Sequence, residues 1–269
     1  MEIRKTSARL LADFEGPAAE LINRLGKAPV VLICEHASNF IPASLSDLGL
    51  NSEGQVSHAA WDLGAYEVAC KLSESLDAPL IASRISRLVY DCNRDPESGL
   101  GIPGKSELFD VPGNRNLSDV DKNDRVNAVY EPFHQLIKQV INTPGRNADV
   151  MQQAGPAIIT IHSFTSVYFG EKRSVELGLL HDKDDRLASA MMTVAKCETN
   201  LNTQFNAPYD ASDNVMHTLN KHAQKGSLLN VMIEVKNDLL SNADDINAVA
   251  SSLSKIITKA LARLNASNS

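Results

Sequence analysis

The sequence is poor in cysteine and in aromatic residues, with four cysteines, one tryptophan and 5% aromatics among 269 residues. The cysteines (Cys34, Cys70, Cys92 and Cys197) lie far apart and form no C-x-x-C pair, which excludes a zinc ribbon and a thioredoxin-type motif. No apolar run approaches the roughly 20 residues that span a bilayer. The first residues also lack the apolar stretch of a signal peptide. We therefore expect a cytoplasmic protein without a membrane partner.

The sequence also has fewer basic than acidic residues. The formal net charge is −7, which disfavours a nucleic-acid partner because such a partner favours a basic face. A local basic pocket is still compatible with this balance. Hydrophobic residues make up 43% of the chain, enough for a substantial core. Since the chain shows no internal repeat and no interior linker, we predict one domain over residues 1–269, with its core at about residues 28–264.

Strand-like and helix-like segments alternate along the chain, which is typical of a mostly parallel sheet with helices on its faces. The expected strands are Val30–Cys34, Pro79–Ala82, Arg87–Cys92, Ala157–Ile161, Glu176–Leu180 and Asn230–Val235. The expected helices are Pro17–Leu25, Ala60–Leu76, Asp119–Ile141, Asp184–Val194 and Asp244–Leu264. Residues 95–113 are rich in glycine and proline and exceed an ordinary connection, so we expect a functional loop there.

Two histidines follow or end β-like apolar runs. His36 comes after Val30–Cys34, and His162 comes after Ala157–Ile161. Ligands of open α/β sheets bind beyond the carboxyl ends of the strands, so the two imidazoles are expected to meet there. Catalytic zinc takes three protein ligands, typically histidines with a carboxylate, and keeps one position open. The pair therefore predicts a metal site, although a histidine after a strand can also be purely structural.

The sequence offers two candidates for the third metal ligand. Glu35 is adjacent to His36, but neighbouring residues on a strand point to opposite faces, so Glu35 would need an irregular backbone to share the metal. Asp62 follows His58 by four residues at the predicted start of a helix, a spacing that places both on one helical face. We prefer Asp62 and keep Glu35 as the alternative. Helix capping or a His58–Asp62 pair would also explain Asp62.

Glu234 ends the apolar run Val231–Ile233, which is expected to form a core strand. A carboxylate is expensive to bury without a partner. Glu234 is therefore either paired with a basic side chain or functional. Beside a metal it would serve as the general base of a hydrolytic reaction.

A group of arginines surrounds the predicted strand Arg87–Cys92. Arginine's planar fork suits bidentate binding of a carboxylate. In an acidic protein, Arg87 and Arg94 near a strand end indicate a small anionic substrate. The alternative is that these arginines form ordinary ion pairs with Asp91 or Asp95.

His134 lies within the long predicted helix, four residues after Tyr130 and close to its apolar stripe. One interpretation is core packing with a hydrogen bond. The other is a contact with substrate, so His134 joins the candidate substrate-binding residues.

Six motifs, taken in this order, resemble the N-formylglutamate amidohydrolase family. They are Cys34–Ser38, His58–Ala65, Ser86–Arg94, Tyr130–His134, Thr160–Phe164 and Ile233–Asp238. The resemblance extends over roughly residues 30–240. The Asp-x-Asn-Arg element ending at Arg94 and the Glu-Val-x-Asn-Asp element starting at Glu234 are its most specific parts.

The resemblance implies an α/β fold of the phosphorylase/hydrolase-like, zinc carboxypeptidase-like type, with three αβα layers around a mixed, mostly parallel sheet. It implies one zinc ion bound by His36 and His162, with Glu234 as the general base. It also implies that Asn93 and Arg94 grip a substrate carboxylate. Arg87 would assist them.

Two departures from related enzymes bear on the substrate. Zinc carboxypeptidases carry a zinc-binding glutamate three residues after the first histidine, where this sequence has Asn39. Glu35 precedes His36, where the histidine-degradation enzymes have a Pro-His-Ser-Gly pattern. The sequence thus resembles a divergent branch of the family.

The implied reaction is hydrolysis of N-formyl-L-glutamate, or of another N-acyl acidic amino acid, and yields formate and L-glutamate in the first case. Three further hypotheses stay open. The chain could be a different N-acyl amino acid deacylase or a carboxypeptidase-like hydrolase, a cysteine hydrolase using Cys34 and His36, or a non-catalytic small-molecule binder.

Overall fold

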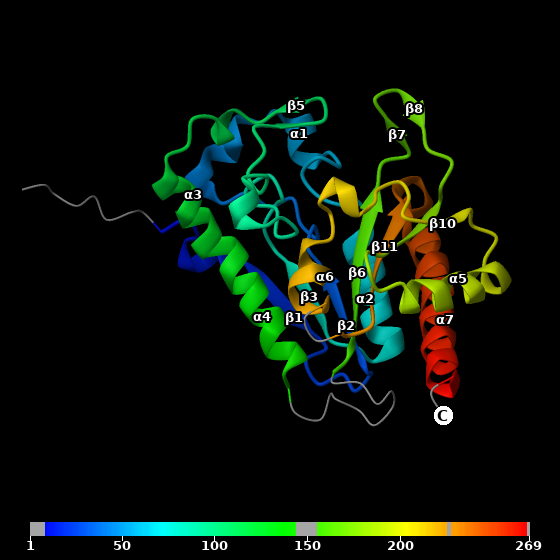
Figure 1. The fold of residues 1–269 in the computed structure, drawn as a ribbon. Coiled ribbons are helices and arrows are strands. Elements are labelled where there is room, and N and C mark those ends of the chain that lie inside the picture. Colours follow the sequence, from blue (N-terminus) through cyan, green and yellow to red (C-terminus); the bar gives the residue numbers. More distant parts are fainter. Residues whose placement is uncertain (1–8, 144–154, 225–226, 268–269) are drawn as a thin grey trace, which may run out of the picture.

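The structure is a computed structural model that describes residues 9–143, 155–224 and 227–267. Its centre is a seven-stranded sheet with the order β1-β3-β2-β6-β11-β9-β10 (Figure 1). The strands are β1 (Ala19–Ile22), β2 (Val30–Cys34), β3 (Leu80–Ser83), β6 (Ala157–Phe164), β9 (Leu177–Leu180), β10 (Thr203–Phe205) and β11 (Asn230–Lys236). Two hairpins, β4–β5 (Lys105–Ser106 and Phe109–Asp110) and β7–β8 (Val167–Tyr168 and Glu171–Lys172), lie outside this sheet.

The four central strands of the sheet are parallel, and the strand on either side of them runs antiparallel to its inner neighbour. Strands β3, β2, β6 and β11 pair in parallel, whereas β1 runs antiparallel to β3 and β9 runs antiparallel to β11. All five residues of β2 and all eight of β6 are buried. Burial on both faces explains why these strands appear in the sequence as continuous apolar runs. The predicted mixed, mostly parallel sheet is therefore confirmed.

Helices cover both faces of the sheet. The helices are α1 (Ser52–Val56), α2 (Ala65–Leu76), α3 (Asp119–Arg125), α4 (Glu131–Ile141), α5 (Arg186–Glu198), α6 (His217–His222) and α7 (Ala243–Ser267). Successive β2 side chains alternate between two cores, one shared with α2, α5 and α7 and the other with α4 and α6. Figure 1 shows α4 on one side of the sheet and α5 and α7 on the other, which confirms three αβα layers.

The long helix predicted over Asp119–Ile141 is present, with one irregularity. A π-helical turn over Val126–Tyr130 joins α3 to α4. Pro132 follows directly in the first turn of α4 and lacks the N–H that an α-helical bond requires. The backbone accommodates the proline with a wider turn instead of a break.

The segment predicted as a helix over Pro17–Leu25 is instead the edge strand β1. Its residues pair with β3 from Ala19 opposite Ser83 to Ile22 opposite Leu80. A short apolar run has no periodicity that separates a helix from a strand. Pairing with the neighbouring strand therefore decides its conformation.

The prediction of a strand over Arg87–Cys92 is wrong, because this segment forms turns. The hydroxyl of Ser86 accepts a hydrogen bond from the N–H of Leu88, and the carboxylate of Asp91 accepts one from the N–H of Asn93. These side chains satisfy backbone groups that a sheet would otherwise pair. Leu88 and its neighbours still enter the core, which explains the strand-like pattern.

Arg125 ties this segment to the loop that follows it. Its side chain is only 2% exposed and donates to the carbonyl oxygens of Val89 (3.1 Å) and Gly113 (3.2 Å) and to the side-chain oxygen of Asn114 (2.6 Å). Burial lowers the pKa of Arg125 to about 10. Arg125 therefore fixes both ends of the stretch that carries the hairpin β4–β5.

None of the described helices is both long and apolar enough to cross a membrane.

Gly64 provides a test of the packing beside α2. Its φ is +78°, and a Cβ at this position would lie 2.6 Å from the Cβ of Leu240. We expect Gly64→Ala to lower the free energy of unfolding by about 2–5 kcal/mol, since it combines left-handed strain with overpacking. Gly99 is the control, because its φ is +72° and a Cβ there would meet nothing within 4 Å. Equal losses in both variants, measured by urea unfolding, would contradict this packing.

Candidate active site

The carboxyl ends of three adjacent parallel strands bring the main candidates together. His36 follows β2, His162 lies near the end of β6, and Glu234 lies near the end of β11. Glu234 is the direct register partner of His162. The sheet thereby places residues from the start, middle and end of the chain in one site, as the sequence predicted.

The two histidines share one carboxylate oxygen. Oδ2 of Asp62 lies 3.2 Å from Nδ1 of His36 and 2.9 Å from Nδ1 of His162. The ring centroids of the two histidines are 4.9 Å apart. All three side chains are buried, and their ligand atoms lie within 4.8 Å of one another. This group can hold a metal ion, and it contains the preferred third ligand, Asp62.

A backbone contact holds Asp62 in place. Its N–H donates to the carbonyl oxygen of His36 at 3.0 Å, and its own carbonyl oxygen accepts from the N–H of Ala65 at the start of α2 (3.1 Å). The turn that leads into α2 is thus fastened to the end of β2.

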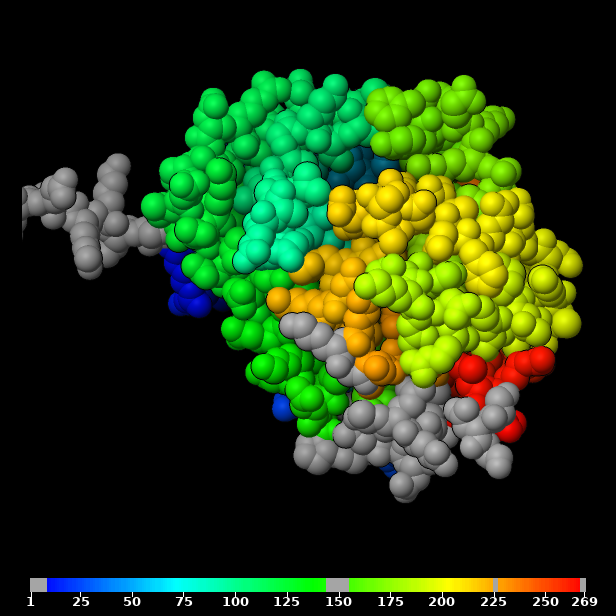
Figure 2. Space-filling model, viewed as in Figure 1, coloured from blue at the N-terminus to red at the C-terminus, as the bar shows by residue number. Residues whose placement is uncertain are grey.

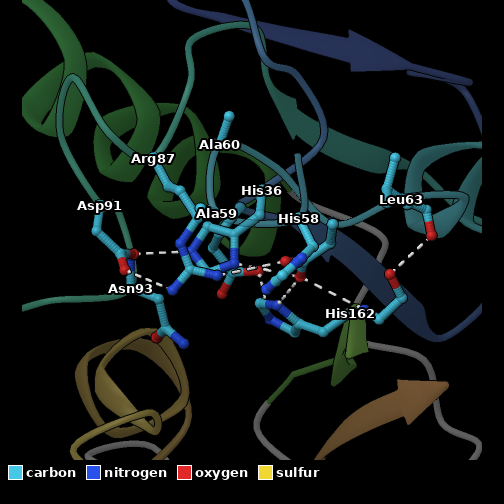
Figure 3. A network of polar contacts seen from close by, with 12 residues as sticks. His36, His58, Ala59, Ala60, Leu63, Arg87, Asp91, Asn93 and His162 are labelled. Atoms are coloured by element: carbon cyan, nitrogen blue, oxygen red, sulfur yellow. Dashed lines mark hydrogen bonds and ion pairs between the residues drawn. The ribbon is translucent and has the colours of Figure 1, made fainter. Parts of the chain in front are cut away.

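A second pair of buried carboxylates faces the outer nitrogen of each ring. Nε2 of His36 lies 2.8 Å from Oδ1 of Asp91, and Nε2 of His162 lies 3.1 Å from Oε2 of Glu35. Figure 3 shows the network around His36, Asp91 and His162. Glu35, the alternative third ligand, is therefore on the far side of His162 from Asp62. Carboxylates in these positions fix the orientation and tautomer of metal-binding histidines, so the donor set fits a metal ion.

The electrostatic interactions in these pairs favour a protonated histidine beside an ionised carboxylate. Burial by itself would lower the pKa of His162, but the facing carboxylates of Glu35 and Asp62 outweigh burial and raise it well above its usual value. Burial would likewise raise the pKa of Asp91, but His36 and Arg87 lower it well below its usual value. Asp91 therefore stays charged beside His36.

Arg87 bridges the two aspartates. Its Nη1 lies 3.3 Å from Oδ1 of Asp62, and its Nη2 lies 3.1 Å from Oδ2 of Asp91. Arg94 contacts the same Asp91 oxygen from 3.7 Å and donates to the carbonyl oxygen of Asp213 at 2.7 Å. The ion pairs considered for these arginines in the sequence therefore exist, and both arginines line the site cavity.

Asn93 lines the cavity, but its amide is already engaged. The amide nitrogen donates to the carbonyl oxygen of Val215, and the amide oxygen accepts from the N–H of Thr218 at 3.0 Å. Asn93 thereby fastens the start of α6 to the site.

The prediction that His134 contacts substrate needs correction. His134 is only 3% exposed and is not among the residues that line the cavity. Its Nε2 lies 2.9 Å from the carbonyl oxygen of Cys92, and its Nδ1 lies 2.8 Å from Nε2 of His222. The apolar stripe of α4 carries His134 into the core, where it supports the turn before Asn93.

Glu234 is buried beside the donor set, and its Oε2 has no hydrogen-bond partner among the described residues. Burial, reinforced by the negative charge of Asp62, raises the pKa of Glu234 to about 7. A carboxyl group with this pKa can both accept and release a proton near neutral pH.

These residues form the floor of a cavity of about 300 Å³. Its walls include His58 and Glu107, which form an ion pair, and Tyr168 and Tyr209. Figure 2 shows the surface hollowed between the blue-green loop region and the hairpin β7–β8. The sequence analysis missed Glu107 and both tyrosines, because they lie in loops and short hairpins without periodicity or a nearby motif.

A mixed α/β sheet with two histidines, an aspartate and a buried glutamate at one end is an arrangement that suits an α/β hydrolase. The chain belongs to the N-formylglutamate amidohydrolase family, whose family model matches residues 28–241. This confirms the resemblance found in the sequence. Among proteins with curated descriptions, none matches the chain.

Two solved structures are similar to this chain. A gene product of Agrobacterium tumefaciens is 44% identical, with a TM-score of 0.89 over 95% of this chain and 99% of that one. An N-formylglutamate amidohydrolase from Ralstonia eutropha is 15% identical, with a TM-score of 0.67 over 93% of this chain and 99% of that one. The second likeness supports the fold alone.

The outer carboxylates provide a test of the donor set. Asp91→Asn and Glu35→Gln should each weaken metal binding by about 10- to 100-fold, because they loosen the rings without removing a ligand. Zinc is the probe, and competition with a chromophoric chelator measures its affinity. Asp110→Asn, at an exposed position in β5, is the control. Unchanged zinc affinity in both test variants would contradict the orienting role of these two carboxylates.

Proposed function

We propose that the chain is a zinc-dependent amidohydrolase that converts N-formyl-L-glutamate and water to formate and L-glutamate. Membership of the N-formylglutamate amidohydrolase family supports the reaction type. The observation that carries the proposal is the buried His36–Asp62–His162 group beside Glu234, because hydrolysis requires activated water and a nearby proton acceptor.

In this proposal His36, Asp62 and His162 hold the zinc ion through Nδ1, a carboxylate oxygen and Nδ1. Two imidazoles and one carboxylate are a common ligand set for catalytic zinc. Bound zinc lowers the pKa of water towards about 7 and polarises a carbonyl group. Asp91 and Glu35 keep the rings aligned, and Arg87 holds the second oxygen of Asp62.

Glu234 moves the proton. It takes a proton from water as the water oxygen bonds to the formyl carbon, and it passes that proton to the nitrogen of glutamate as the C–N bond breaks. The formyl group leaves as formate, and the amine is released on L-glutamate. A pKa near 7 suits both transfers, because a strongly acidic carboxylate would bind the proton too weakly.

The proposed substrate is a small anion, and Arg94 is its main candidate partner. The side chain of Arg94 lines the cavity and is 19% exposed. Its separation of 3.7 Å from Asp91 is longer than the corresponding separation of 3.1 Å for Arg87. Arg87 supports the metal ligand Asp62, which leaves Arg94 as the cavity arginine proposed to bind a substrate carboxylate.

The rim of the cavity favours a second candidate substrate class. Phe164, Tyr168 and Tyr209 line it, and a formyl group needs no aromatic wall. An N-acyl acidic amino acid with a larger acyl group would use this surface.

Metal analysis and product release test the proposal together. Protein purified without chelator is expected to carry one zinc ion per chain and to release formate from N-formyl-L-glutamate. Removal of zinc should abolish release, and its return should restore it. A panel of N-acyl amino acids separates the two substrate classes. Bound metal without turnover of any member would indicate a binding protein, and activity that resists chelation would contradict the zinc mechanism.

The role of Glu234 is tested by Glu234→Gln, which keeps the shape of the side chain but cannot accept the proton. We expect kcat to fall by about 10²- to 10⁴-fold while zinc content is unchanged. Glu171→Gln, at an exposed position in β8, is the matched control and should keep full activity. Retention of full activity by Glu234→Gln would require a different base.

A further inference from the structure

We propose that Tyr209 is a further catalytic residue, whose hydroxyl donates a hydrogen bond to the scissile carbonyl oxygen as that oxygen gains negative charge, and that Arg173 is its positioning residue. This inference rests on the proposed amide hydrolysis. Tyr209 lies in the segment after β10, far in sequence from the strand-end residues of the site.

The hydrogen bond to Arg173 determines which way the Tyr209 hydroxyl points. Nη1 of Arg173 donates to the oxygen of Tyr209 at 3.1 Å and to the carbonyl oxygen of Thr165 at 3.3 Å. An oxygen that accepts from a guanidinium keeps its own hydrogen for another acceptor. Among the described residues, no side chain or carbonyl accepts that hydrogen. Since Tyr209 lines the cavity, a bound substrate can supply the acceptor.

Three aromatic rings hold Arg173 in position. Its guanidinium carbon lies 4.5 Å from the ring centroid of Tyr168, 4.9 Å from that of Tyr209 and 5.6 Å from that of Phe164. Phe164 is the last residue of β6, two residues after His162. Phe164 therefore connects Arg173 to the strand that carries His162. Tyr168 connects Arg173 to the hairpin β7–β8.

Tyr209 lines the same cavity as the residues proposed to carry out the reaction. In Figure 2 its yellow-to-gold segment borders the hollow, and Glu234 lines the same cavity. Burial and then the charge of Glu234 raise the pKa of Tyr209, so the hydroxyl keeps its proton. The water that gives its proton to Glu234 must lie next to the carbonyl carbon. A hydroxyl donor in the wall of this cavity is thus placed to reach the oxygen on which charge develops.

The alternative role of Tyr209 is to bind a substrate carboxylate. The two roles differ kinetically, because a transition-state contact affects kcat and a uniform binding contact affects KM. Arg94, which lines the cavity, already offers a positive charge for a carboxylate. A neutral hydroxyl suits an oxygen that is uncharged in the substrate and becomes charged during the reaction.

Tyr209→Phe tests the role with the least structural change. We expect kcat to fall by about 10²-fold or more, KM to change by less than about threefold, and zinc content to be unchanged. Tyr66→Phe is the matched control, because it removes a hydroxyl that donates to Glu20 at 2.7 Å outside the cavity. The control should keep the activity of the wild type.

A binding measurement supplies a readout that is independent of turnover. The probe is an analogue of N-formyl-L-glutamate in which a tetrahedral H-phosphinate group replaces the formyl group and a methylene replaces the amide nitrogen. Calorimetry should show weaker binding of this analogue to Tyr209→Phe by about 10²-fold, with the affinity for L-glutamate unchanged. Arg173→Lys should lower kcat in the wild-type background and cause little further loss in the Tyr209→Phe background, because it acts through Tyr209.

Each outcome is decisive. If kcat of Tyr209→Phe stays within threefold of the wild-type value, or if only its KM changes, the catalytic role of Tyr209 is overturned. Additive losses in the double variant would overturn the positioning role of Arg173. If the wild type hydrolyses no N-acyl amino acid, the proposed function fails and this inference fails with it. If the wild type is active and Tyr209→Phe is unaffected, only this inference fails.

Discussion

The site depends on one shared carboxylate oxygen. Oδ2 of Asp62 lies between Nδ1 of His36 and Nδ1 of His162, and each ring is held from behind by a second buried carboxylate. Five charged or chargeable groups in a dry interior are tolerable only if their charges compensate. The arrangement therefore specifies a narrow geometry, in which both Nδ1 atoms face the same point, and a cation at that point would complete the compensation.

The remaining structure serves to hold that geometry. Parallel pairing of β2, β6 and β11 fixes the heights of His36, His162 and Glu234 at one sheet edge. The turn after β3 brings in Arg87 and Asp91, and buried Arg125 holds that turn through backbone carbonyl oxygens. The ends of the strands thus place the two histidines and Glu234, and turns place Asp62, Asp91 and Arg87 around them.

The part of the site that lies on strands was predictable from the sequence. His36, His162 and Glu234 each end an apolar run, and parallel strands end at a common edge. The turn containing Asp91 was mistaken for a strand, because burial gives turns and strands the same apolar pattern when side chains satisfy the backbone. The position of Tyr209 depends on contacts between distant segments, which no local pattern records, whereas the core packing of His134 was one of the two interpretations that the sequence offered.

We propose that two imidazoles and one carboxylate hold a zinc ion on which amide hydrolysis depends. X-ray absorption at the zinc edge of the loaded protein is a direct test. We expect two imidazole nitrogens at about 2.0–2.1 Å, oxygen ligands at similar distance and no sulfur. A sulfur ligand at about 2.3 Å, or a spectrum without imidazole scattering, would contradict it.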